Sequence, residues 1–194
     1  FHIVVAEELA RTGGGGVSAS AMSHSIGLPP VAKFGSEALK KRVMPAVLAG
    51  EKIAALAVTE PGGGSDVAAL RTTAVRDGDH WVLTGEKTSI SMADQADWAV
   101  VFARTGTVEA RAHGISAFLV DMKATGITTT RFSDVGEHAI GRGSIFFDAV
   151  RVPATHMLGK EGSGFVQVMQ GFDFSRALIG LQCLAVARVS LAET

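Results

Sequence analysis

The stretch from residue 57 to residue 66, AVTEPGGGSD, combines the residue types that a ligand-contacting loop needs. An apolar run, residues 53–58, can form a buried strand, and Pro61 ends it because proline has no N–H to donate to a neighbouring strand. The three glycines that follow let a ligand approach bare backbone N–H groups. The hydroxyls of Thr59 and Ser65 can donate or accept hydrogen bonds. The same spacing also fits a plain glycine-rich turn, so this stretch alone leaves both alternatives open.

A second glycine-rich stretch, residues 13–19, matches the G-x-G-x-x-A pattern of dinucleotide-binding proteins. That fingerprint requires a strand directly before it, and residues 7–12 (EELART) make a poor strand. We therefore favour small residues at which helices pack closely or turn, and we regard a dinucleotide site here as the weaker alternative.

Composition excludes several classes of protein. The 194 residues are 47% hydrophobic and 19% charged, which is enough for one packed domain, or one and a part, and unlike a disordered tail. A net charge of −1 argues against nucleic acid as a partner. No apolar run approaches the roughly 20 residues of a membrane span, so no membrane insertion is expected. Cys183 is the only cysteine. With no basic signal-peptide region in view, this predicts a reducing, cytoplasmic location.

The period of the apolar residues changes near residue 53. Before it, helical patterns cover residues 1–12, 18–26 and 36–48, with a break at residues 27–30 (GLPP) and Ser36 as a helix N-cap. After it, six or seven short strands are expected, including a hairpin around residues 77–79 (DGD). A long helical pattern with apolar residues on more than one face follows from residue 165, typical of a helix buried in a bundle. These elements predict an α+β chain with an antiparallel β-barrel or sandwich in its middle.

Several segments in the same order resemble the signatures of the acyl-CoA dehydrogenase family. They are residues 58–66 (VTEPGGGSD), 84–98 (TGEKTSISMADQADW), 147–153 (FDAVRVP), 158–165 (LGKEGSGF) and 173–176 (DFSR). The resemblance implies three parts. Residues 1–52 would end an N-terminal helical domain, residues 53–158 would form the central β-domain, and residues 159–194 would begin a truncated C-terminal helical domain.

The resemblance also implies a site for FAD and for an acyl-CoA substrate, with no metal. Thr59 would hydrogen-bond the flavin ring, and Ser65 would lie where the flavin and coenzyme A meet. The implied cofactor-binding residues are Leu56, Ala57, Val58, Thr59, Gly64, Ser65, Ser89, Ile90 and Ser91. The implied substrate-binding residues are Ser65, Asp173, Phe174, Ser175 and Arg176. By spacing alone, a simple i, i+3 helix pair is the favoured interpretation of Asp173 and Arg176.

Two departures from the family pattern bear on the chemistry. Many members have an aromatic residue at the position of Ser89 and threonine at the position of Ser91, so a stacking surface is lost while a hydroxyl is kept. One branch of the family has its catalytic glutamate where Ser175 stands, and the other has it beyond Thr194. The base that takes the α-proton is therefore expected outside this chain, with Asp173 as a weak candidate within it.

The resemblance implies dehydrogenation of an acyl-CoA thioester, with removal of an α-proton by a carboxylate and transfer of a β-hydride to FAD. The amino-acid sequence of residues 86–97 and 172–176 is most similar to that of the cyclohexanecarboxyl-CoA dehydrogenase subgroup. An electron-transfer flavoprotein as acceptor and a homotetramer are expected by resemblance. Two alternatives stay open: an oxidase or monooxygenase relative, and a non-catalytic ligand-binding β-module. The isolated chain, as a fragment without its base, is expected to be inactive.

Overall fold

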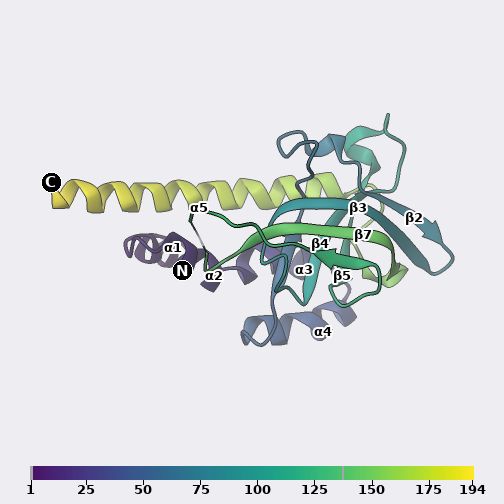
Figure 1. Cartoon of the computed structure of the whole chain (residues 1–194), viewed down its shortest axis with the longest axis horizontal. Helices are drawn as coiled ribbons and strands as arrows, with labels where there is room; N and C mark the ends of the chain where they lie inside the picture. The colour runs from purple at the N-terminus through teal and green to yellow at the C-terminus, as the bar shows by residue number, and fades with distance from the viewer. Residues whose placement is uncertain (1, 137) are drawn as a thin grey trace.

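Four helices precede the first strand in the computed structural model, which describes residues 2–136 and 138–194 (Figure 1). They are α1 (His2–Ala10), α2 (Gly15–Ala21), α3 (His24–Phe34) and α4 (Glu37–Leu48). The predicted cap of the last one is confirmed, since the Ser36 hydroxyl accepts a hydrogen bond from the Leu39 N–H at 3.3 Å. The glycine run at residues 13–16 follows α1 and not a strand, so the dinucleotide fingerprint lacks its required context.

Helix α3 corrects the prediction of a break at residues 27–30, because it continues through Pro29 and Pro30. Two prolines remove two backbone donors, which normally ends a helix. Here tertiary packing outweighs that preference. Gly27, Leu28 and Val31 are buried, and Gly27 lies so close to β1 that a Cβ atom on it would be 2.3 Å from the carbonyl oxygen of Ala54.

The strands form one sheet in the described part of the chain, in the order β6-β7-β3-β2-β4-β5-β8, with β1 beside β4. Their bounds are β1 (Ala54–Ala57), β2 (Thr73–Asp77), β3 (His80–Ser91), β4 (Trp98–Arg104), β5 (Ile115–Asp121), β6 (Ile127–Thr129), β7 (Arg142–Pro153) and β8 (Met157–Leu158). Three short 3-10 helices interrupt them: η1 (Val67–Ala69), η2 (Arg111–Gly114) and η3 (Ala154–His156). Most pairings are antiparallel, as predicted, but β1 runs parallel to β4, and β2 meets β4 in parallel at Thr73 and Arg104.

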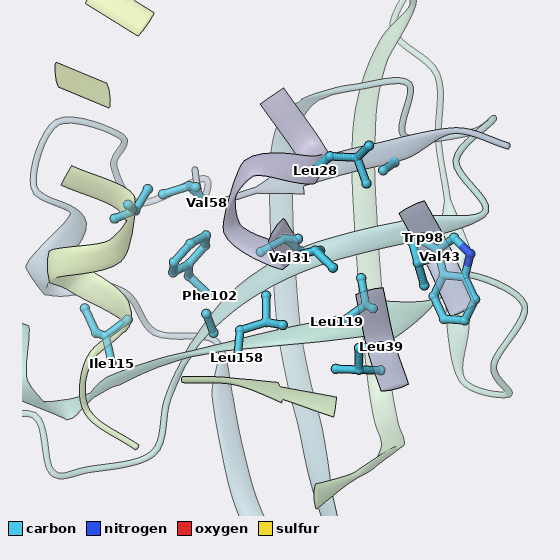
Figure 2. Packing of buried hydrophobic residues seen from close by; sticks show 14 of the residues in the cluster. Leu28, Val31, Leu39, Val43, Val58, Trp98, Phe102, Ile115, Leu119 and Leu158 are labelled. Carbon is cyan, nitrogen blue, oxygen red and sulfur yellow. The ribbon is translucent and has the colours of Figure 1, made fainter. Parts of the chain in front are cut away.

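The sheet has a hydrophobic core on each face. On one face, α3 and α4 pack against β4 and β5; Figure 2 shows Val31 of α3 near Phe102, Leu119 and Leu158 of the same cluster. On the other face, residues from β1, β3, β4, β5 and β7 form a second cluster, which includes Trp81, Phe118 and Phe147. Successive residues of β4 alternate between the two cores, which explains why all seven of its residues are buried. The α+β class is thus confirmed.

Helix α5 (Gly164–Glu193) extends away from the sheet and runs beside α1 (Figure 1). Only Gly164, Gln167, Val168 and Ala185 are buried in it. The sequence prediction places the other helices of its bundle outside this chain, so burial of the apolar residues of α5 stays a prediction. By length and composition α5 also passes the test for a membrane-spanning helix, with a mean hydropathy of 1.4 over 18 residues. This differs from the sequence prediction, in which no apolar run is long enough to cross a membrane. It is weak evidence, because core helices of other proteins pass the same test.

Candidate functional site

A cavity of about 150 Å³ brings together six of the nine residues predicted to bind the cofactor. These are Leu56, Val58, Thr59, Ser89, Ile90 and Ser91. They come from the end of β1 and the end of β3, and α3 and α5 add Ile26 and Phe172 from two other sides. Apolar walls with hydroxyls among them suit a flat ring system with a polar edge. Since typical ligand pockets hold about 300–1,000 Å³, the cavity would hold only part of a cofactor as large as FAD.

The end of β3 turns toward this cavity through an irregular backbone. Pairing with β7 shifts between Lys87 and Ile90, and Ser89 within the shift has a φ of +57°. A left-handed conformation is costly for a residue other than glycine, and such residues are typical of functional sites. Met92 repeats the conformation with a φ of +60°, and its N–H donates to the Gly141 carbonyl at 2.8 Å. The two positions direct residues 89–91 to the cavity.

The glycine loop, residues 60–66, lies at the rim of this cavity. Glu60 and Gly63 form a small bridge with two backbone hydrogen bonds, and residues 62–66 are exposed. Gly64 and Ser65, both predicted site residues, therefore lie outside the cavity lining. The Asp66 carboxylate accepts two hydrogen bonds from Arg111, at 2.9 and 3.2 Å. Ala57, also predicted, faces the other side of the sheet and belongs to the second core.

Two residues that the sequence prediction did not assign to the site, Glu60 and Lys87, form a buried ion pair beneath the loop. Lys87 Nζ donates to Glu60 Oε1 at 2.8 Å and to the Val58 carbonyl at 3.0 Å, and the Lys87 side chain is 0% exposed. Burial lowers the pKa of Lys87 to about 8, although Glu60 opposes the shift. Burial raises the pKa of Glu60, but the charge and hydrogen bond of Lys87 outweigh this, so the pKa is lower than usual.

The four predicted substrate residues on α5 lie on its exposed part. Asp173 and Arg176 pair with each other at 3.4 Å, the arrangement that their spacing allows. Ser175 donates to the Phe172 carbonyl at 3.1 Å, and Phe174 is largely exposed. Only Phe172, their neighbour, lines the cavity. The predicted contact of Asp173, Phe174, Ser175 and Arg176 with coenzyme A stays a prediction.

None of the described residues that line the cavity carries a carboxylate. Asp173 is exposed, and Glu60 is held by Lys87 and by the N–H groups of Arg71 and Thr72 at 2.6 and 2.9 Å. A carboxylate that accepts three hydrogen bonds in a buried site is a poor proton acceptor. No group of potential metal ligands occurs among the described residues.

A larger cavity, of about 390 Å³, lies elsewhere, where β2 separates from β4. It is lined by Arg76, Trp81 and Arg104 among others, and by none of the predicted site residues. We place the candidate site in the smaller cavity because the chemically suitable residues of β1, β3 and α5 meet there.

Comparison with known proteins agrees with this arrangement. Residues 55–150 match the acyl-CoA dehydrogenase middle domain, and residues 1–51 match the acyl-CoA dehydrogenase N-terminal domain. The chain belongs to the acyl-CoA dehydrogenase family. Proteins of this family are flavoproteins that use FAD.

Two curated relatives illustrate the similarity. Cyclohexane-1-carbonyl-CoA dehydrogenase of Geobacter metallireducens is 39% identical over 165 residues, which are 84% of this chain and 43% of that protein. The human mitochondrial short-chain specific acyl-CoA dehydrogenase is 37% identical over 191 residues, 98% of this chain and 46% of that protein. The chain thus spans somewhat less than half the length of these relatives.

Among solved structures, a probable acyl-CoA dehydrogenase from Mycobacterium abscessus superimposes with a TM-score of 0.93 at 40% identity. The superposition covers 98% of this chain and 50% of that chain. Because nearly all of this chain is covered, the arrangement of helices and sheet described above is that of the family.

Proposed function

We propose that the chain is the flavin- and substrate-binding portion of an enzyme that oxidises an acyl-CoA thioester to its α,β-unsaturated product. The observation that carries the proposal is the cavity in which the ends of β1 and β3 meet Phe172 of α5. Family membership supports the reaction class, and the similarity to a cyclohexane-1-carbonyl-CoA dehydrogenase supports an alicyclic acyl group as the first substrate to test. The same proposal includes domain boundaries after residues 52 and 158. It also includes a homotetramer and a cytoplasmic location.

In this proposal Leu56, Val58 and Ile90 pack against the flavin ring, and the hydroxyls of Thr59 and Ser91 hydrogen-bond its polar edge. When bound, FAD supplies the acceptor for the hydride that leaves the β-carbon of the substrate. Ser65, at the exposed rim, is placed to contact the coenzyme A portion. Phe172 closes the cavity from α5 and excludes water from its apolar side.

The carboxylate that removes the α-proton comes from residues outside this chain, since the described lining of the cavity supplies none. Proton removal leaves negative charge on the thioester carbonyl oxygen. Hydrogen-bond donors at that oxygen would stabilise this charge. Electrons would leave the reduced enzyme through an electron-transfer flavoprotein.

The test uses the protein encoded by the whole gene. We expect it to purify with, or to take up, FAD with a visible absorbance band, and anaerobic cyclohexane-1-carbonyl-CoA or butyryl-CoA should bleach that band. Failure to bind FAD would overturn the proposal and favour a non-catalytic β-module. Steady release of hydrogen peroxide in air during turnover would instead indicate an oxidase.

A further inference from the structure

The Glu60 carboxylate joins the two ends of the glycine loop. We call these ends its neck: Glu60 at the start, and Arg71 and Thr72 where the chain returns. Its Oε2 accepts from the Arg71 N–H at 2.6 Å, and its Oε1 accepts from the Thr72 N–H at 2.9 Å. The same side chain therefore holds the first residues of the loop and the chain that returns from it, 11 and 12 residues later. The exposed residues 62–66 are carried on a neck that is itself buried, with Glu60 7% and Thr72 1% exposed.

Lys87 connects this neck to β3 and to β1. Its Nζ bonds Glu60 and the carbonyl of Val58, and the next residue along β3 donates its N–H to the Thr59 carbonyl at 2.9 Å. Val58 and Thr59 line the cavity from the segment after β1, and Ser89, two residues after Lys87, lines it from the adjacent segment of β3. The ammonium group of Lys87, a residue of β3, thus donates both to Val58, in the segment that follows β1, and to Glu60 of the glycine loop.

Stability alone does not account for a pair of this kind. A buried ion pair has a large desolvation cost, and well-packed apolar residues in its place are often as stable or more stable. Its distinguishing property is geometry, because two charged side chains with several bonds each tolerate few arrangements. That property matters where segments from distant parts of the sequence must meet a ligand with sub-ångström accuracy.

We propose that Glu60 and Lys87 are positioning residues that hold the two flavin-contacting segments, residues 56–59 and 89–91, in one mutual arrangement. The inference rests on the proposed function. Neither side chain touches the cofactor in this view; they act through the Val58 carbonyl and through the neck of the loop. Without these two side chains, the two segments sample other distances from each other. Only a fraction of the molecules can then bind FAD, and the apparent affinity falls with that fraction.

The experiment compares FAD binding by the protein encoded by the whole gene with that of three variants. Lys87→Met removes the donor to Val58. The double variant Glu60→Gln/Lys87→Met removes both charges, so that no unpaired carboxylate stays buried. Val152→Ala serves as a control for stability loss. It makes a cavity in the core at the other end of β3 and β7, where Val152 pairs with Trp81, about 30 Å along the strand from Ile90.

We expect the dissociation constant of FAD to rise about tenfold in both Lys87 variants and to change less than about twofold in Val152→Ala. Hydrogen exchange at the Arg71 and Thr72 amides should also accelerate in the double variant. Unchanged FAD affinity in the double variant would overturn the positioning role and leave the proposed function intact. An equal loss in Val152→Ala would overturn it too, since general destabilisation would then suffice. A wild-type protein that does not bind FAD overturns the proposed function, and the positioning role falls with it.

Discussion

A guanidinium nitrogen of Arg42 lies 3.3 Å from Nε2 of His156, and this contact determines which ring nitrogen carries the proton. Since a guanidinium group only donates, Nε2 accepts, and the proton lies on Nδ1, 3.1 Å from the Leu119 carbonyl. Arg42 also lies over the Trp98 ring, 5.0 Å from its centroid. A neutral imidazole thus links α4 to β5, and its ring centroid lies 6.4 Å from that of Trp98, a core residue labelled in Figure 2.

The first prediction is that this histidine makes stability depend on pH. Burial, with a further contribution from the charge of Arg42, lowers the pKa of His156 below its ordinary 6.5. The unfolded chain therefore binds a proton near pH 6.5 that the folded protein does not yet accept, so the free energy of unfolding should fall as pH drops below about 6.5. Urea midpoints between about pH 8 and about pH 5 measure this.

His156→Gln keeps an acceptor and a donor but does not titrate in this range, so its midpoint should fall less steeply with acid than that of the wild type. Parallel curves for the two proteins would show that His156 is not the responsible group.

The second prediction concerns Arg104, whose guanidinium group is buried and donates to four backbone carbonyls. The acceptors are Leu70 at 2.9 Å, Ala68 at 2.8 Å, Thr107 at 3.1 Å and Arg111 at 3.2 Å. Arg104→Met leaves these carbonyls without that donor, so we expect the free energy of unfolding to fall by about 3 kcal/mol. The measurement is urea denaturation. Arg111→Met removes an exposed ion pair to Asp66 and should cost less than about 1 kcal/mol. Equal losses would contradict the prediction.

Most strands could be predicted because their apolar runs and turn residues are local signals. The hairpin at residues 77–79 is an example: β2 and β3 pair from Asp77 with His80 onward, and Gly78 has the positive φ that its turn needs. Helix α3 could not be predicted, because the packing that overrides Pro29 and Pro30 involves β1, more than 20 residues away in the sequence.

The residues of the candidate site also fall into those that could be predicted from the sequence and those that could not. The wall residues Val58, Thr59 and Ile90 could be predicted, because they lie within contiguous motifs. The pairing of Glu60 with Lys87 could not, since it joins residues 27 apart and depends on how β1 and β3 fold together. The only signal in the sequence was a carboxylate shortly after an apolar run and a lysine within a mixed polar strand, and such charged residues are usually solvated.

The third prediction tests the close packing of α3 on β1. Gly27→Ala would place a methyl group 2.3 Å from the Ala54 carbonyl oxygen, so the helix must move away from the strand. We expect a loss of about 1–3 kcal/mol in the free energy of unfolding. FAD affinity should fall as well, because Ile26 and Ala54 both line the cavity. Thermal denaturation and FAD titration measure the two effects.

Gly180→Ala is the matched control for this change. Gly180 lies in α5, and a methyl group on it would point into open space with respect to the described residues. Alanine there should therefore raise the free energy of unfolding by up to about 1 kcal/mol, since it favours the helix more than glycine does. If Gly27→Ala were as stable as the wild type, α3 would not be held against β1 as closely as described.

The fourth prediction concerns the hydroxyl of Thr59 in the proposed flavin site. Thr59→Val keeps the shape of the side chain and removes only the hydroxyl, so the fold should be retained while a hydrogen bond to the flavin is lost. A net value of about 1 kcal/mol for one hydrogen bond corresponds to a roughly fivefold rise in the dissociation constant of FAD. Thr128→Val, on the exposed edge strand β6, makes the same chemical change away from the cavity and should leave that constant unchanged. If Thr59→Val also left it unchanged, the Thr59 hydroxyl would not contact the cofactor, and the polar edge of the flavin would have to be bound by Ser91 or another donor.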